Sequence, residues 1–332
     1  MTAIDTPFTR AVGIEIPMIC GAMYPCSNAE LVAAASAAGG IGIVQPISLM
    51  YVHGHPDLRE GLRYIRSLTD KPIGFNAIVE KSSKVYLERM RRWVDVAVEE
   101  GVRFFITALG NPDWVVDKVH AAGGVVYHDV TARKWAEKAL QAKVDGLICV
   151  NDAAGGHAGT LSAQALFDDL KDLGVPLVCA GGIGDEQAFA AALEVGYAAV
   201  QLGTRFIATA ECRAHDDYKQ AILRARAEDI VLTERISGVP VAIIKTPYVE
   251  KVGTRAGFLG RWALRHPRFK HWARAFYSFR SIWDLKRSSL RGSSYRDFFQ
   301  AGRSVEGIEK IEPVADIVRR YAEAAAARHS CS

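Results

Sequence analysis

The stretch Gly146-Leu147-Ile148-Cys149-Val150 runs directly into Asn151-Asp152-Ala153-Ala154-Gly155-Gly156-His157-Ala158-Gly159. A short apolar run of this kind predicts a strand that is buried on both faces, as in a parallel sheet. The loop that follows consists mostly of small residues, which allow a flat ligand to approach the backbone closely. It also holds His157, whose imidazole has a pKa near working pH. The two segments therefore predict one strand-then-helix unit with an active-site loop.

The same alternation continues on both sides of this unit, from Pro17 to about Ala227. The predicted strands are 17–23, 41–46, 73–79, 103–110, 125–130, 146–150, 177–182 and 199–206. The predicted helices lie near 28–38, 57–69, 85–100, 112–122, 131–142, 163–174, 185–195 and 214–227. Asn28 and Asp185 stand where helix N-caps are expected. Eight such units favour an α/β fold of the (β/α)₈ TIM-barrel type over an open doubly wound sheet.

The chain beyond Ile230 breaks this alternation. Its segment 251–303 has thirteen Lys or Arg against two acidic residues, a balance of +11, whereas the whole chain carries +4. Aromatic residues at helical spacing predict amphipathic helices packed on the barrel, most clearly at Phe269, Trp272, Phe276 and Phe279. A last helix is expected over 311–327. We therefore predict a barrel domain over 1–229 and a basic, mainly helical extension over 230–332.

Composition narrows the functional class. The 332 residues are 49% hydrophobic and 23% charged, which is ordinary for a soluble globular enzyme. No apolar run approaches the roughly 20 residues that cross a bilayer, and the N-terminus lacks a signal-peptide pattern. The six cysteines show no metal-ligand spacing, so we expect free thiols, a cytoplasmic setting and no metal. No nucleic-acid motif accompanies the basic tail, which either covers the barrel or attracts an anionic substrate.

The candidate site lies at the carboxyl ends of the predicted strands, where barrel enzymes bind their ligands. After the seventh and eighth strands, Gly181-Gly182 and Gly203-Thr204 offer backbone N–H groups close to a helix start. Such groups suit a phosphate, and these two loops are the usual phosphate site of the barrel. The alternative is that the glycines only make tight turns, but two such loops at this spacing favour the phosphate site.

Four motifs resemble the nitronate monooxygenase family, long called 2-nitropropane dioxygenases, which are FMN-containing TIM barrels. They are Pro17-Met18-Ile19-Cys20-Gly21-Ala22-Met23, Gly155-Gly156-His157-Ala158-Gly159, Ala180-Gly181-Gly182-Ile183 and Gly203-Thr204-Arg205-Phe206. They occur in the family's order between about Phe8 and Glu211. The family often has a Lys soon after the fifth strand, where this chain has His128 and Asp129. The electrostatics around the flavin's pyrimidine ring therefore stay open.

The resemblance implies FMN as the cofactor and His157 as the catalytic residue that faces flavin and substrate. It implies further cofactor-binding positions, which fall into two groups. The flavin ring would lie against Gly21, Ala22, Met23, Asn76, Asn151 and Gly156, with His128 either touching it or bracing the strand end. The phosphate would be held by Ala180, Gly181, Gly182, Gly203 and Thr204.

The resemblance also implies an activity. The chain would use O2 to oxidise an alkyl nitronate, or a nitroalkane, to a carbonyl compound and nitrite. The partners would be a small, anionic substrate and O2, with neither nucleic acid nor membrane, and a homodimer is left open. The alternative is an NAD(P)H-dependent flavin reductase that acts on quinones or enoyl thioesters, because related flavoproteins share the motifs.

Overall fold

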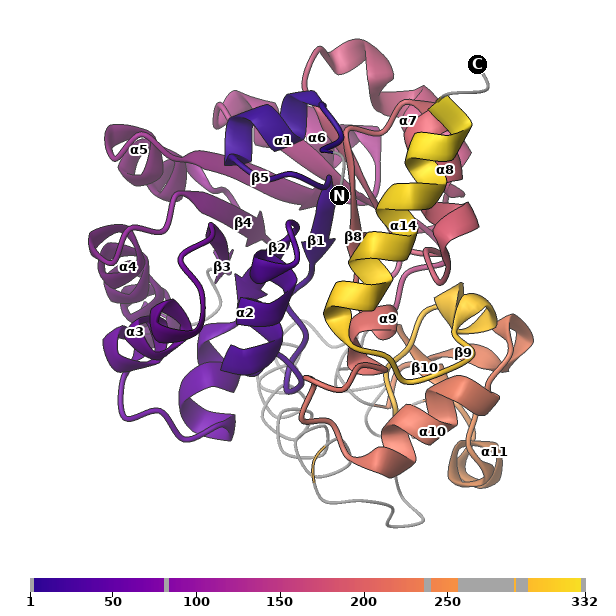
Figure 1. Cartoon of the computed structure of the whole chain (residues 1–332). Helices are drawn as coiled ribbons and strands as arrows, with labels where there is room; N and C mark the ends of the chain where they lie inside the picture. Colours follow the sequence, from indigo (N-terminus) through magenta and orange to yellow (C-terminus); the bar gives the residue numbers. More distant parts are fainter. Residues whose placement is uncertain (1–2, 81–83, 236–239, 256–289, 291–297, 330–332) are drawn as a thin grey trace, which may run out of the picture.

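A computed structural model describes residues 3–80, 84–235, 240–255, 290 and 298–329. Eight parallel strands close into a barrel in chain order, with β1 pairing with both β2 and β8 (Figure 1). They are β1 (Met18–Cys20), β2 (Ile41–Val44), β3 (Ile73–Ile78), β4 (Phe104–Ala108), β5 (Val125–Val130), β6 (Gly146–Val150), β7 (Leu177–Ala180) and β8 (Ala199–Leu202). The predicted (β/α)₈ barrel is therefore confirmed.

The predicted helices form the outer ring of the barrel. They are α2 (Ala29–Ala37), α3 (Leu58–Leu68), α4 (Lys84–Glu99), α5 (Asp113–Ala121), α6 (Arg133–Gln141), α7 (Ala163–Leu170), α8 (Glu186–Val195) and α10 (Asp216–Arg224). A π-helical segment, Ser48–Val52, precedes α3, and short 3-10 turns follow at Lys171–Leu173 and Ala227–Asp229. The predicted strand 199–206 was too long. It ends at Leu202, because Gly203 turns the chain into a short helix, α9 (Thr204–Ile207).

Side chains alternate between the barrel axis and the helical layer along each strand. An inner cluster fills the axis and includes Ile19, Ile43, Phe104, Tyr127, Ile148, Val178 and Ala199. Phe8 of α1 (Pro7–Val12) joins it through edge-to-face contacts with Phe104 and Tyr127, both at 5.4 Å between ring centroids. Aromatic pairs at this separation are stabilising. The N-terminal end of the barrel is thus closed by α1, and the carboxyl ends of the strands are left for a ligand.

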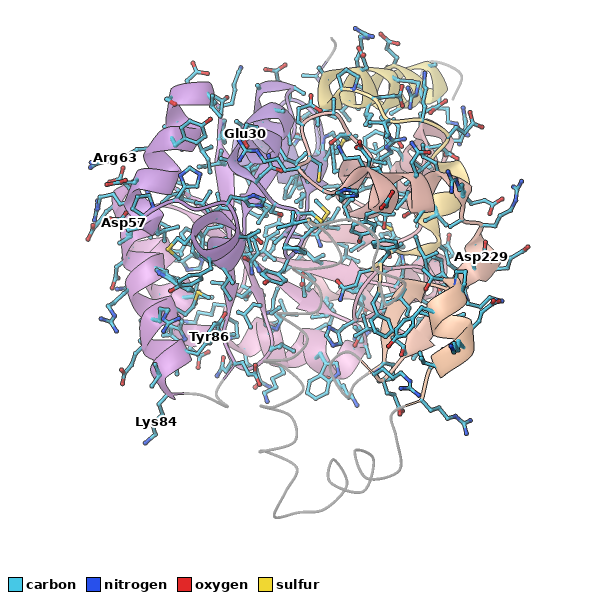
Figure 2. All side chains as sticks on the ribbon, turned by 90° about the horizontal axis from the view of Figure 1, so that it is seen from below. Glu30, Asp57, Arg63, Lys84, Tyr86 and Asp229 are labelled. Atoms are coloured by element: carbon cyan, nitrogen blue, oxygen red, sulfur yellow. The ribbon has the colours of Figure 1, made fainter. Side chains whose placement is uncertain are left out.

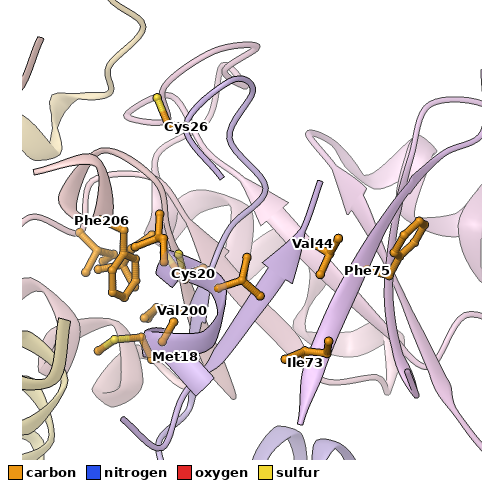
Figure 3. Close-up of a cluster of buried hydrophobic side chains, with 14 of the residues drawn as sticks. Met18, Cys20, Cys26, Val44, Ile73, Phe75, Val200 and Phe206 are labelled. Carbon is orange, nitrogen blue, oxygen red and sulfur yellow. The ribbon is translucent and has the colours of Figure 1, made fainter. Parts of the chain in front are cut away.

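A second, outer cluster lies between the strands and the helices. Figure 3 shows part of it, with Met18, Cys20 and Val200 gathered near Phe206 of α9. The five described cysteines are buried, and no disulfide bond joins any of them. None of the described helices is both long enough and apolar enough to span a bilayer.

The two predicted N-caps differ. Asp185 caps α8 as expected, since its carboxylate accepts the Ala188 N–H at 2.8 Å. Asn28 precedes α2, but its side chain makes no capping bond. Its amide instead donates to the Glu211 carbonyl at 2.9 Å and accepts the Arg213 N–H at 3.1 Å. That side chain therefore ties the loop after β1 to the segment after α9.

The tail begins with a hairpin that was not predicted. β9 (Ile230–Thr233) pairs antiparallel with β10 (Val241–Ile244), and α11 (Pro247–Val252) follows. In Figure 2 Asp229, just before β9, lies on the opposite side of the molecule from Asp57, which caps α3. A 3-10 turn, Arg303–Gly307, leads to α14 (Val314–His329), the predicted last helix, which packs on α2 and α8 (Figure 1). The aromatic helices expected around 269–279 lie outside the described residues.

Candidate functional site

Two polar side chains face the barrel axis near the ends of their strands, and each has one buried oxygen without a hydrogen-bond partner among the described residues. Tyr127 and Ala199 belong to the inner cluster, and residues two positions apart share a face of a strand. Asp129 on β5 and Gln201 on β8 therefore also point inward. Asp129 Oδ1 and Gln201 Oε1 are buried and accept no hydrogen bond from any described residue. Desolvation raises the pKa of Asp129 to about 7. The sequence prediction gave neither residue a role.

The predicted flavin residues Asn76 and His128 point in opposite directions. Asn76 lies between Phe75 and Ala77 of the outer cluster, so it faces the axis. His128 follows the inner Tyr127 and therefore points outward, where its Nδ1 lies 2.8 Å from Thr107 Oγ1. Burial lowers the pKa of His128 to about 4, so its ring is neutral at pH 7. The structure thus places His128 as a brace between β4 and β5, and its contact with flavin stays a prediction.

Asn151 holds the loop after β6 in place. Its Oδ1 accepts the Ala153 N–H at 2.9 Å, and its Nδ2 donates to the Gly181 carbonyl at 3.0 Å. Its backbone carbonyl accepts the Gly159 N–H at 3.0 Å. With 1% of its surface exposed and both ends of its amide in use, Asn151 joins the loop after β6 to the loop after β7. A direct contact with flavin stays a prediction.

His157 stands at the tip of this loop. The residue is exposed, yet the surrounding protein lowers the pKa of its imidazole below the usual 6.5 by desolvation. The ring is therefore neutral at pH 7, with one nitrogen that accepts and one that donates. The preceding Gly156 adopts a φ of +70°, and its carbonyl accepts the Ala242 N–H of β10 at 2.8 Å.

The loops after β7 and β8 leave backbone donors unpartnered. Gly181 and Gly182 have φ values of +118° and +82°, which other residues adopt only with strain. Gly203 comes next to Thr204, the first residue of α9. The N–H groups of Gly182, Gly203 and Thr204 donate to no acceptor among the described residues. Backbone N–H groups without protein partners, at the ends of neighbouring strands, suit a phosphate group.

The loop after β1 lies against the end of β8. A Cβ atom on Gly21 would stand 3.0 Å from Cγ of Gln201, so a larger residue there would displace that side chain. A Cβ atom on Gly203 would stand 3.6 Å from Sδ of Met23, and Ala22 packs on the inner cluster. The structure therefore brings together the predicted Gly21, Ala22, Met23 and Gly203.

The segment at Gly302 and Arg303 contacts the loops after β6 and β8. The sequence prediction missed this contact. The Gly302 N–H donates to Thr204 Oγ1 at 3.1 Å, and the Arg303 N–H donates to the Ala153 carbonyl at 2.9 Å. The approach is close, because a Cβ atom on Gly302 would stand 2.5 Å from that carbonyl oxygen. Gly155 faces the same crowding from Gly302, at 2.9 Å from its nitrogen. Residues far along the chain thus hold the loop that carries His157.

Arg205 attaches α9 to the segment just before α14. Its guanidinium is 1% exposed, donates to the Lys310 carbonyl at 2.8 Å and lies 3.7 Å from Glu312 Oε2. Arg320 of α14 holds the same carboxylate through two bonds, at 2.6 and 3.0 Å. Removing one partner of a buried ion pair of this kind lowers the stability of a protein by several kcal/mol. The helix that begins with Thr204 is therefore attached to the last helix of the chain.

The described residues fit FMN at both of its polar ends. The unpartnered N–H groups of Gly182, Gly203 and Thr204 match a phosphate, and the unpartnered oxygens of Asp129 and Gln201 match a ring with polar edges. By contrast, no three His, Cys, Asp or Glu side chains gather into a metal-binding group in the part of the chain that the structure describes.

Known proteins resemble this chain along most of its length. A protein of Mycobacterium tuberculosis H37Rv named (3aS,4S,5R,7aS)-5-hydroxy-7a-methyl-1-oxo-octahydro-1H-indene-4-carboxyl-CoA dehydrogenase is 32% identical over 259 residues, which are 76% of this chain and 70% of that protein. The nitronate monooxygenase of Pseudomonas aeruginosa is 30% identical over 274 residues, covering 70% of this chain and 77% of that protein.

Solved structures agree with this similarity. FabK of Thermotoga maritima superposes with a TM-score of 0.80 at 28% identity and covers 98% of both chains. A nitroalkane oxidase of Streptomyces ansochromogenes superposes with a TM-score of 0.76 at 21% identity, which supports the fold alone. The family model described as nitronate monooxygenase matches residues 5–322. The chain therefore belongs to the nitronate monooxygenase family of oxidoreductases.

Proposed function

We propose that this protein uses FMN and O2 to oxidise alkyl nitronates to a carbonyl compound and nitrite. The observation that carries the proposal is His157, a neutral and solvent-accessible imidazole on the glycine loop after β6. Membership of the nitronate monooxygenase family and the similarity to the Pseudomonas aeruginosa enzyme support it. When bound, FMN supplies the electron transfer and the reaction with O2.

The cofactor would be held mainly by backbone groups. The N–H groups of Gly182, Gly203 and Thr204 would bind its phosphate, supported by Ala180 and Gly181. Gly21, Ala22 and Met23 would lie against the ring, and Asn76 would bond its polar edge from the axis-facing side of β3. Gly156 would bring the loop close to the ring. Asn151 and His128 would act indirectly, because their hydrogen bonds hold the strand ends that carry these groups.

His157 would handle the substrate's proton. A neutral imidazole can accept the α-proton of a nitroalkane, or donate a hydrogen bond to a nitronate that is already ionised. The two tasks differ in what they need, because only the first requires a base. Loss of the imidazole should therefore reduce turnover of the neutral nitroalkane more than turnover of the preformed nitronate.

The test compares His157→Ala with the wild-type protein. We expect the variant to bind FMN as the wild type does, and to lose about 100-fold or more in turnover of 2-nitropropane. Turnover of the preformed nitronate of 2-nitropropane should fall less. Unchanged turnover of both substrates would refute the role of His157.

A second candidate is an oxidoreductase that acts on thioesters or quinones with NAD(P)H. It is favoured by the similarity to the Mycobacterium tuberculosis protein whose name specifies a carboxyl-CoA substrate. Anaerobic mixing separates the two, with flavin absorbance as the readout. Rapid bleaching by NADH or NADPH, followed by reoxidation with a quinone or an enoyl-CoA, would establish the second candidate. Bleaching by the nitronate alone would support the first.

A further inference from the structure

Asp129 stands out among the acidic residues of the barrel. It occupies the last inward position of β5, two residues beyond the inner Tyr127, at the end of the barrel where ligands bind. Its Oδ1 is buried and has no hydrogen-bond partner among the described residues. A buried polar atom without a partner calls for an explanation, and an absent ligand is one of the common ones.

No positive charge among the described residues compensates this carboxyl. Within the described residues, the pKa of Asp129 is raised by desolvation alone, with no contribution from a charged neighbour. On β4, Thr107 is neutral, and on β5 the imidazole of His128 is neutral because burial lowers its pKa to about 4. On β6, Cys149 interacts electrostatically with Asp129, and burial raises the pKa of that thiol, so it stays neutral.

Three described titratable groups farther out do not compensate Asp129 either. The loop after β6 contributes His157, which is neutral at pH 7, and Asp152, which lies 3.8 Å from Arg303. At the start of α6, which follows β5, Arg133 is engaged with Asp172 and Glu137 on the surface. None of the described residues therefore supplies a counter-ion that would hold Asp129 in its ionised form.

We infer that Asp129 contacts the bound flavin as a protonated carboxyl, and that its ionisation places an uncompensated negative charge beside the cofactor. This inference rests on the proposed flavin site. The protonated carboxyl can donate a hydrogen bond to the ring, whereas the ionised form can only accept. Covering an unpaired charge with the bound ring would remove it from water, which is costly. FMN is itself an anion through its phosphate, so its binding should weaken as the carboxyl ionises.

The consequence is a pH dependence with a defined direction. The pKa of about 7 for Asp129 means that the carboxyl is mostly protonated at pH 6 and mostly ionised at pH 8. If the protonated form alone binds FMN well, the Kd rises about tenfold between these pH values. The phosphate of FMN contributes little to this trend above pH 7, because its second pKa is near 6.

The experiment titrates the apoprotein with FMN between pH 6 and pH 9 and follows the quenching of flavin fluorescence. In the wild type we expect the Kd to rise about tenfold from pH 6 to pH 8. Asp129→Asn, which keeps the shape and removes the charge, should bind FMN with a Kd that changes less than twofold. Asp152→Asn removes a half-exposed carboxylate from the neighbouring loop and should retain the wild-type trend.

Three outcomes decide the matter. A flat Kd in the wild type, or a wild-type trend in Asp129→Asn, overturns the assignment of Asp129 while FMN binding itself stands. Failure of the wild type to bind FMN at any pH overturns the proposed function, and this inference with it. Should Asp129→Asn not fold, Asp129→Ser serves the same comparison. The infrared band of a protonated carboxyl in the wild-type holoprotein, lost as pH rises through neutrality, is a check that needs no variant.

Discussion

The amide of Asn151 donates to the Gly181 carbonyl at 3.0 Å, and this bond joins the loop that carries His157 to the loop with unpartnered backbone donors. The same side chain accepts the Ala153 N–H at 2.9 Å, so both the oxygen and the nitrogen of its amide are hydrogen-bonded. Through this one residue, the expected catalytic group and the expected phosphate site share a support. Displacing either loop should therefore disturb the other.

Gly181→Ala tests this coupling. A Cβ atom at this position would stand 2.3 Å from Asn151 Oδ1 and 2.6 Å from the backbone nitrogen of Ala154. We expect the variant to lose FMN binding by at least tenfold and to be destabilised by about 1–3 kcal/mol. Equilibrium dialysis with FMN and urea unfolding measure the two effects.

Gly174→Ala is the matched control for this change. Gly174 has a φ of +74° and nothing within 4 Å of an added Cβ, so it reports the cost of the backbone conformation alone. It should lose stability but bind FMN as the wild type does. Equal FMN binding in Gly181→Ala and the wild type would show that the two loops are not coupled through Asn151.

His128→Asn tests the buried imidazole through the pH dependence of stability. The pKa of His128 is lowered to about 4 in the folded chain, against 6.5 when unfolded. The folded state therefore resists protonation, and stability is lost as pH falls from about 6.5 to about 4. This loss amounts to about 3 kcal/mol in total. Asparagine removes the titration and keeps a polar atom near Thr107 Oγ1.

We therefore expect the free energy of unfolding to fall less steeply between pH 7 and pH 5 in His128→Asn than in the wild type. Urea unfolding at the two pH values gives the comparison. An acid dependence identical in both proteins would mean that His128 is not the buried group that resists protonation.

Gly302→Ala tests the returning tail. Gly302 has a φ of −97°, which alanine adopts without strain, so the change acts only through contact. Its Cβ would stand 2.5 Å from the Ala153 carbonyl oxygen and 2.6 Å from the Gly155 nitrogen. We expect turnover to fall at least tenfold while the far-ultraviolet circular dichroism of the barrel is retained. Wild-type turnover would argue that the tail does not set the position of the His157 loop.

Much of the barrel could be predicted from the sequence because parallel strands buried on both faces appear as continuous apolar runs. The predicted strands 125–130 and 146–150 coincide with β5 and β6. The glycines at the strand ends could be predicted for a related reason, since close approach and positive φ restrict those positions to one residue type.

The direction of the side chains at the end of β5 could not be predicted in the same way. Alternation requires His128 and Asp129 to face opposite sides, but Val126 and Tyr127 before them are both apolar and both buried. Nothing local therefore says which row faces the axis. The contact of Gly302 with Thr204 spans 98 positions and carries no periodic signal at all.

That separation has a consequence for how the protein is made. All eight strands of the barrel, and every loop proposed to bind the cofactor, leave the ribosome before Gly302 is synthesised. Because domains tend to fold from the N-terminus during synthesis, the barrel can close while the His157 loop still lacks its last support. Capture of the cofactor in its final geometry then becomes a late event, available only to chains whose translation has passed Gly302.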